Sequence, residues 1–213
     1  MKTLMVAGAL LLFACSSSPT PQLASPNETP APTIAGVLGA DSDYNTCHYQ
    51  KSPQSGTDAQ LVLPDPACTP GAADTTLTMA QACAPELARP DLTAVKLTTL
   101  VKYGRAPNRS TAKKIAKYYE LDHFVPRWMG SSRTPGGPQG SDTEANLWPE
   151  PHPTPNAKDG LEFQLYTLIC HPKPTANYPG GLVKARLDIQ HDWVALWIAS
   201  GRPKVTNPLG LND

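Results

Sequence analysis

The sequence predicts an α+β domain in which a small hairpin-and-helix unit is surrounded by further helices and stapled by disulfides. A short β-like run, residues 119–126, precedes a loop rich in Gly, Ser and Pro, as expected for a strand that ends in a turn. Apolar residues recur at helical spacing in two later stretches, 158–170 and 182–200. The chain length fits one domain.

Residues 1–15 have the features of an export signal. Lys2 supplies a positive start, and the apolar run that follows, residues 4–14, is too short to span a bilayer. The run ends Leu-Phe-Ala-Cys, which resembles the lipobox of bacterial lipoproteins and implies that Cys15 becomes a lipidated first residue. The alternative is a simple cleaved signal, with Cys15 discarded or left as a thiol. We therefore expect an exported protein, anchored by lipid at the bacterial cell envelope or else secreted, with no transmembrane helix in the mature chain.

Residues 16–42 are expected to form a disordered tether. Five prolines stand among Ser, Thr and Ala between residues 16 and 36, with almost no charge. Such a composition cannot bury a hydrophobic core. The folded domain is expected over residues 43–200, followed by a frayed tail, 201–213.

Four cysteines remain after the leader and indicate two disulfides: Cys47, Cys68, Cys83 and Cys170. Three pairings are possible. Closing the loop between Cys68 and Cys83 is worth on the order of 3 kcal/mol in the chain-entropy model. This favours Cys68–Cys83 with Cys47–Cys170, although the sequence leaves the pairing open. The cysteines do not have the spacing of zinc ligands.

A basic segment precedes the candidate site. Between residues 92 and 119 the chain has seven basic residues and no acidic ones: Lys96, Lys102, Arg105, Arg109, Lys113, Lys114 and Lys117. Thr93 can cap a short helix here, and a second helix or irregular turn is expected over 110–117. Such a cluster can contact nucleic-acid phosphates; the alternative is a solvated surface. The net charge of the whole chain is zero with histidine neutral, so the basic excess typical of nucleic-acid binders is absent.

Adjacent Asp122 and His123 are the first candidates for chemistry. Neighbouring side chains of a strand point to opposite faces, so the pair can share one ligand only where the strand bends or ends. Pro126 marks such an end. A carboxylate and an imidazole placed there can act as metal ligand and general base. The alternative is a structural hydrogen bond at a turn.

An ordered set of motifs around this pair resembles the HNH (His-Me finger, ββα-metal) nuclease superfamily. The set comprises D-H-x-V-P, a glycine-bearing loop, N-L-W-P-E-P, and a helix that opens with Lys158, Asp159 and Glu162. Small exported bacterial proteins of HNH-like type also share Cys-Thr-Pro-Gly at 68–71 and Asp-Trp at 192–193. The resemblance implies a ββα-metal site and one divalent cation, with Mg²⁺ expected and Mn²⁺ or Ca²⁺ as alternatives.

The resemblance also implies a role for each site residue. His123 would deprotonate water for attack on a phosphodiester, and Asp122 would bind the cation that stabilises the developing charge. Asn146 would brace the loop and so orient the base. The superfamily's third position, at the start of the site helix, holds Pro155 here, followed by Asn156. Asn156 is our candidate for the second metal ligand.

Two alternatives to that ligand remain open. Asn156 can instead be a plain helix cap, and His152 is the second candidate ligand. Lys158, Asp159 and Glu162 have no role that we can derive, and a salt-bridged helix surface is the default expectation for them.

The two later helices supply core residues. The first is expected over 158–170, capped by Asn156 or Thr154, and the last over 182–200. The three tryptophans of this region are expected in the core rather than as stacking platforms for bases: Trp148, Trp193 and Trp197.

These features predict a metal-dependent nuclease domain at the bacterial cell envelope that cleaves DNA or RNA with little sequence preference. Nucleic acid is its expected partner, with the membrane contacted only through the lipid anchor. The alternative is a non-catalytic envelope lipoprotein that keeps an HNH-like scaffold as a binding or structural module. Zero net charge and the missing third histidine favour this alternative, and the Asp-His and Asn set favours the enzyme.

Overall fold

The computed structural model describes residues 41–58, 60–85, 90–130, 142–151 and 155–204. By its internal contacts the chain divides into two units, Met1–Val37 and Leu38–Asp213, and every described residue belongs to the second. The export signal, Cys15 and most of the tether lie outside the described residues, as does the tail beyond residue 204. Over the described part of the chain, no helix is long and apolar enough to cross a membrane.

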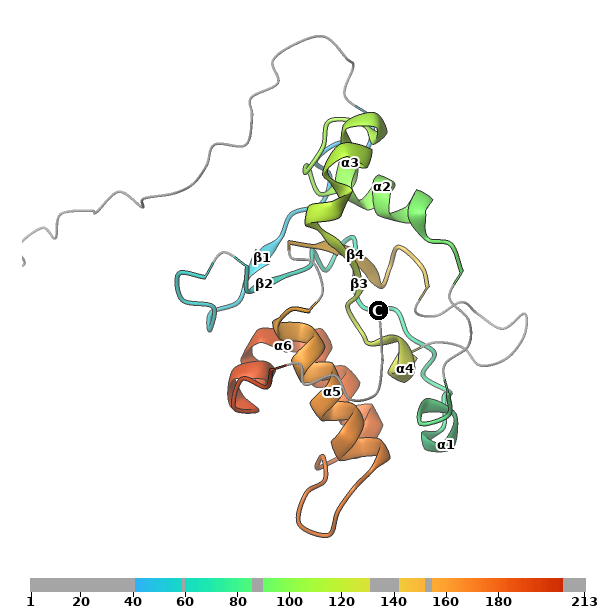
Figure 1. The fold of residues 1–213 in the computed structure, drawn as a ribbon, viewed down its shortest axis with the longest axis vertical. Coiled ribbons are helices and arrows are strands. Elements are labelled where there is room, and N and C mark those ends of the chain that lie inside the picture. Colours follow the sequence, from blue (N-terminus) through green and yellow to red (C-terminus); the bar gives the residue numbers. More distant parts are fainter. Residues whose placement is uncertain (1–40, 59, 86–89, 131–141, 152–154, 205–213) are drawn as a thin grey trace, which may run out of the picture. The chain divides into compact units, whose positions relative to one another are not determined.

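The described domain is α+β, as the sequence predicts (Figure 1). It contains two small antiparallel sheets: β1 (Gln50–Lys51) with β2 (Val62–Leu63), and β3 (Glu120–His123) with β4 (Leu147–Glu150). Its helices are α1 (Met79–Ala82), α2 (Thr93–Lys102), α3 (Arg109–Ile115), the 3₁₀ helix η1 (Ala116–Tyr118), α4 (Arg127–Gly130), α5 (Ala157–Cys170) and α6 (Gly181–Ala199). The first sheet, α1 and α4 are additions that the sequence pattern did not predict.

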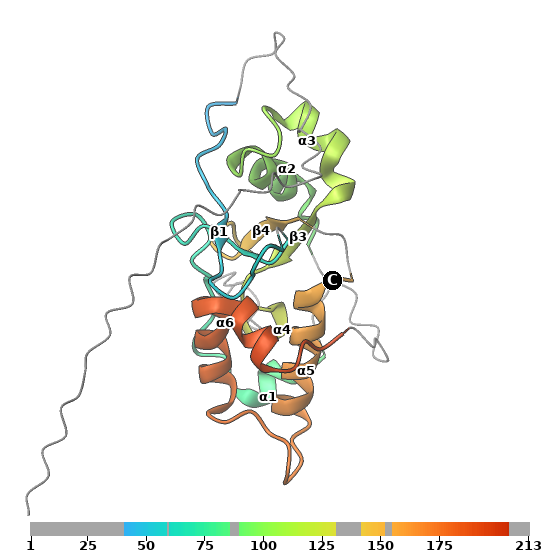
Figure 2. The ribbon, with the colours of Figure 1, turned by 90° about the vertical axis from the view of Figure 1, so that its left-hand side faces the viewer.

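Two apolar clusters hold these elements together. The larger one lies between α5 and α6 and extends to β4. It contains Trp148 and Trp193, whose exposed fractions are 0% and 1%. The predicted core positions of these two tryptophans are confirmed, whereas Trp197 is only partly buried. The smaller cluster joins α2 and α3. In both views the β3–β4 sheet lies between these two helix pairs (Figures 1 and 2).

Local signals account for most helix starts. Asn156 caps α5 in a capping box with Asp159, as one of the two predicted caps. The other, Thr154, lies outside the described residues. The predicted cap of α2 is wrong: Thr93 is the first helical residue, and its amide donates to the carboxylate of Asp91 at 2.9 Å. The aspartate two residues earlier therefore performs the role expected of Thr93.

The last helix is not continuous, although one helix was expected. Asp192 has extended backbone angles, φ −166° and ψ 94°, inside α6. Its Oδ1 accepts the amide of Ala195 at 2.9 Å, which is the bond of an N-cap, and its Oδ2 accepts the hydroxyl of Ser52 at 2.7 Å. The kink therefore restarts the helix at a buried contact with a residue far away in the sequence.

The two predicted disulfides are present, but the favoured pairing is wrong. The bonds are Cys47–Cys68 and Cys83–Cys170. The second closes a separation of 87 residues because Cys83 ends α1 and Cys170 ends α5, and the fold brings these ends together. Loop-closure entropy rises only slowly with loop length, so the length of a loop was a poor guide to its partner.

Candidate functional site

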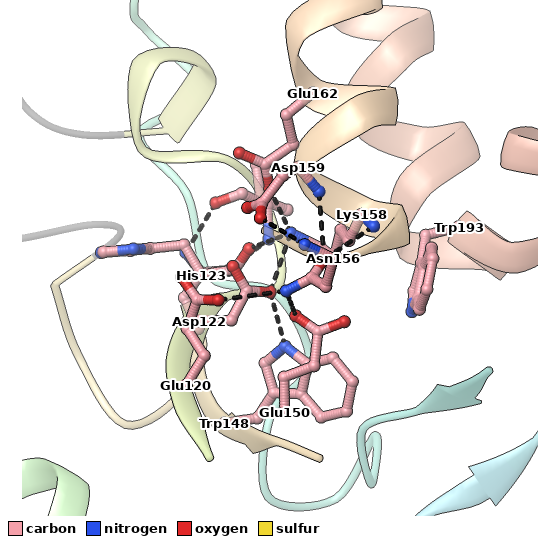
Figure 3. Close-up of polar contacts among 12 residues, drawn as sticks. Glu120, Asp122, His123, Trp148, Glu150, Asn156, Lys158, Asp159, Glu162 and Trp193 are labelled. Carbon is pink, nitrogen blue, oxygen red and sulfur yellow. Dashed lines mark hydrogen bonds and ion pairs between the residues drawn. The ribbon is translucent and has the colours of Figure 1, made fainter. Parts of the chain in front are cut away.

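The register of β3 and β4 gathers carboxylates on one face of the sheet. Glu120 pairs with Glu150 and Asp122 pairs with Trp148, so all four side chains point the same way. Trp148 Nε1 donates to Asp122 Oδ2 at 2.9 Å. This face meets the first turn of α5, and Figure 3 shows the side chains converging there.

Lys158 lies at the centre of this cluster. Its Nζ forms an ion pair with Asp122 Oδ2 at 2.9 Å, and it donates hydrogen bonds to the carbonyl oxygen of His123 at 2.7 Å and to Glu162 Oε1 (Figure 3). Only 1% of the residue is exposed. The default expectation of a salt-bridged surface is therefore wrong for Lys158, because its ammonium is enclosed between β3 and α5.

The surrounding carboxylates keep this lysine charged. Burial by itself would lower the pKa of Lys158, but the nearby carboxylates of Asp122, Glu162 and Glu150 outweigh it and hold the pKa well above its usual value. The ammonium donates two hydrogen bonds and faces the carboxylate of Asp122 as an ion pair. The cluster is thus a closed arrangement of one cation and several acids.

The same surroundings that keep Lys158 charged disfavour the charged form of Glu150. Burial raises its pKa well above the usual range, the carboxylates of Asp122 and Glu120 add to the rise, and Lys158 offsets part of it. The side-chain amide of Asn156 donates to both Glu120 and Glu150 at 3.0 Å. Burial and the neighbouring carboxylates therefore disfavour the charged form of Glu150.

Asn156 has the geometry of a helix cap. Its Oδ1 accepts the amides of Lys158 at 2.8 Å and Asp159 at 3.1 Å, which uses both lone pairs of that oxygen. Asp122 meanwhile binds Lys158 and Trp148. Asn156 therefore has the geometry of the capping alternative, and Asp122 Oδ2 faces Lys158 and Trp148; cation binding by these two residues stays a prediction. The second candidate, His152, lies outside the described residues.

Across the described ranges, no group of three or more His, Cys, Asp or Glu side chains is placed to hold a metal ion. Beside the cluster, Glu150 and Asn156 line a hollow of about 470 Å³ with Trp193, Trp197 and Lys204 among its other walls.

His123 belongs to a second cluster on the other face of β3. Its Nε2 lies 2.8 Å from Asp142 Oδ1, and its side chain is 6% exposed. Arg127 Nε lies 3.5 Å from the same carboxylate oxygen. Asp122 and His123 are thus separated by strand alternation. The sequence pattern did not identify Asp142 or Arg127, which carried no motif of their own.

Asn146 braces the chain next to His123, which is the role that the resemblance implies. Its Oδ1 accepts the amide of Val125 at 2.8 Å, and its Nδ2 donates to the carbonyl of Val125 at 2.9 Å. Its backbone carbonyl also accepts the amide of Phe124 at 2.7 Å. The asparagine is completely buried and ties the residues after β3 to the start of β4.

The seven basic residues predicted to contact phosphate fall into two groups by exposure, two that are half-buried and five that are exposed. Lys102 is paired with Glu144, and Lys96 is half-buried, with its pKa lowered by burial against an opposing effect of Glu120. Five residues are exposed: Arg105, Arg109, Lys113, Lys114 and Lys117. The last four lie on α3 and η1, where no acidic residue interrupts them, and we call these four the basic strip.

Searches for similar proteins found no match to this chain among family models, curated proteins or solved structures. A functional assignment therefore depends on the resemblance of the motifs and on the geometry of the two clusters around β3.

Proposed function

We propose that the domain is an HNH-like nuclease, held at the bacterial cell envelope by a lipidated Cys15, that hydrolyses phosphodiester bonds of DNA or RNA with little sequence preference. The observation that carries the proposal is the His123–Asp142 pair at the end of β3, 2.8 Å apart. It is supported by the order β3, β4, α5 and by the brace that Asn146 provides beside the histidine.

The pair has the chemistry of an oriented general base. In the tautomer that donates Nε2–H to Asp142, the Nδ1 lone pair of His123 accepts a proton from water. The carboxylate orients the ring and stabilises the imidazolium that forms. An imidazole can both accept a proton and release it again, as a general base must.

Two sets of basic side chains are available to an anionic substrate: Arg127 beside the His123–Asp142 pair, and the basic strip. Arg127 lies against the carboxylate that orients His123, where a guanidinium can stabilise charge developing on a phosphate. The basic strip on α3 and η1 is exposed and can contact the sugar-phosphate backbone without reading sequence.

A non-catalytic envelope lipoprotein is the second candidate function. Two observations favour it: the expected cation ligands Asp122 and Asn156 are engaged elsewhere, and the His123 side chain is only 6% exposed. In this case the HNH-like scaffold would present the basic strip or the hollow beside Glu150 to a partner.

An assay of the full-length protein in detergent, on plasmid DNA and on RNA, separates the two candidates. Reactions contain Mg²⁺, Mn²⁺, Ca²⁺ or a chelator, and His123→Ala is compared with His191→Ala, a change at an exposed histidine of α6. The nuclease proposal expects cleavage in wild type and His191→Ala and a loss of about 10²–10⁴-fold in His123→Ala. The absence of both cleavage and salt-sensitive nucleic-acid binding under every condition would leave the non-catalytic candidate.

A further inference from the structure

Lys158 lies between Asp122 and the start of α5, the two places where the resemblance implies metal ligands. Asp122, the expected metal ligand, gives its Oδ2 to the ammonium at 2.9 Å, and the lysine stands in the first turn of α5, next to Asn156, the other expected ligand. Glu162, one turn further along the helix, closes the shell from the opposite side. The ammonium therefore joins the strand end to the helix start, as a bridging cation would.

We propose that the ammonium of Lys158 is the resident cation of this domain and replaces a divalent ion between Asp122 and Glu162. It is a positioning residue: its bond to the His123 carbonyl, at 2.7 Å, holds the end of β3 from which the imidazole projects. The inference deepens the proposed function, because it concerns the cation of the same site, but its test does not need cleavage.

Competition explains why a divalent ion does not displace this lysine. Freeing the ammonium would break two hydrogen bonds, to the His123 carbonyl and Glu162, and the ion pair with Asp122, inside a site that is 1% exposed at the lysine. Charge-assisted bonds of this kind are roughly twice as strong as neutral ones, and an unpaired buried ammonium is costly. Binding of Mg²⁺ or Mn²⁺ would have to offset that loss, although the carboxylates it would use already bind other groups.

Removal of the Lys158 side chain should instead favour binding of a divalent cation. Lys158→Ala leaves Asp122 and Glu162 without their shared cation and vacates the space of the ammonium and its stem. Carboxylate and carbonyl oxygens are the ligands that hard divalent cations take, and the His123 carbonyl faces the same space. We therefore expect the variant to gain a divalent site that the wild type does not have.

The test measures Mn²⁺ binding by electron paramagnetic resonance and thermal unfolding with and without Mn²⁺, on the full-length protein in detergent. The matched control is Lys184→Ala, which removes the lysine of an exposed i,i+4 pair with Asp188 on α6. We expect Lys158→Ala to bind one Mn²⁺ at least tenfold more tightly than wild type or Lys184→Ala. Mn²⁺ should raise the melting temperature of Lys158→Ala alone, and the gain should vanish in Lys158→Ala/Asp122→Asn.

Two results would overturn the inference. One is Mn²⁺ binding by wild type that Asp122→Asn abolishes, a measurement that does not depend on whether Lys158→Ala folds. The other is a folded Lys158→Ala that binds Mn²⁺ no better than Lys184→Ala. Loss of cleavage in every assay would remove the proposed function but leave these binding results unchanged, so the two ideas fail separately.

Discussion

Two lysines with the same local pattern have different surroundings in this protein. Lys158 pairs with Glu162 on α5, and Lys184 pairs with Asp188 on α6, in each case four residues along the helix. The side chain of Lys158 is 1% exposed and that of Lys184 is 55% exposed. The same spacing therefore produces a buried cation that organises a site in one helix and a solvated surface pair in the other.

The difference comes from the element that covers each pair. β3 lies over the first turn of α5 and adds the carboxylate of Asp122 and the carbonyl of His123 to the shell of Lys158. Around Lys184 the acceptor is Asp188, which also accepts the hydroxyl of Tyr178. Water screens the exposed pair, whereas the buried pair interacts in surroundings of low dielectric constant.

The largest expected effect is on folding stability. Lys158→Ala should lower the free energy of unfolding by about 3–5 kcal/mol, because it leaves buried carboxylates without their cation. Lys184→Ala should lower it by about 0.5 kcal/mol or less, as exposed i,i+4 pairs do. Urea denaturation measured in the absence of divalent cations compares the two variants. Equal losses would show that burial of Lys158 does not matter to stability.

A smaller effect is expected when the acid of each pair is changed instead. Asp122→Asn keeps an oxygen that can accept from Trp148 but removes the charge facing Lys158, so we expect a loss of about 1.5–3 kcal/mol, the range for hydrogen bonds to charged groups. Asp188→Asn should cost about 1 kcal/mol or less. The same urea titrations measure both, and a larger loss in Asp188→Asn would contradict the comparison.

The two regions should also respond to pH with opposite signs. Burial raises the pKa of Glu150, with a further rise from Asp122 and Glu120, so its ionisation destabilises the fold as pH rises above its ordinary value of 4.5. Although burial opposes it, hydrogen bonds from Lys184 and Tyr178 lower the pKa of Asp188 below 3.8, so its charge stabilises the fold above that pH.

Neutral variants make this difference measurable. Relative to wild type, Glu150→Gln should become more stable as pH rises from about 4.5 towards 8, by more than the roughly 0.5 kcal/mol typical of surface changes. Asp188→Asn should be less stable near neutral pH and should match wild type once the pH falls below the folded-state pKa of Asp188. Melting temperatures measured from well below pH 3.8 up to pH 8 give both curves. A pH dependence of Glu150→Gln parallel to that of wild type would contradict the raised pKa of Glu150.

The smallest effect on stability is expected for the exposed lysines of the basic strip, which we propose contact nucleic acid. Neutralising Lys113, Lys114 and Lys117 together should change the free energy of unfolding by about 0.5 kcal/mol or less. Nucleic-acid affinity should fall uniformly across sequences, and the slope of log affinity against log salt should flatten by about one unit per lost contact. Fluorescence anisotropy at several salt concentrations measures this slope, with Lys184→Ala as the exposed-lysine control. An unchanged slope would show that the basic strip does not contact phosphate.

The sequence by itself determined the features that depend on close neighbours. The α+β class, the start of α5 at Asn156 and the core positions of Trp148 and Trp193 follow from periodicity, capping and apolar size. The two disulfides follow from the even number of cysteines that remain after the predicted export signal. The bracing geometry of Asn146 agrees with its place in the motif order.

The tertiary structure alone decided everything that depends on which elements meet. It placed Lys158 against Asp122, paired His123 with Asp142, which lies 19 residues further along the chain, joined Cys83 to Cys170, and restarted α6 at Asp192. The physical reason is that periodicity and capping act over three or four residues, whereas burial, desolvation and ion pairing depend on groups brought together from distant parts of the chain. A lysine followed four residues later by an acidic residue has the same local pattern on a surface and in a core, and only the strand packed over it makes the difference.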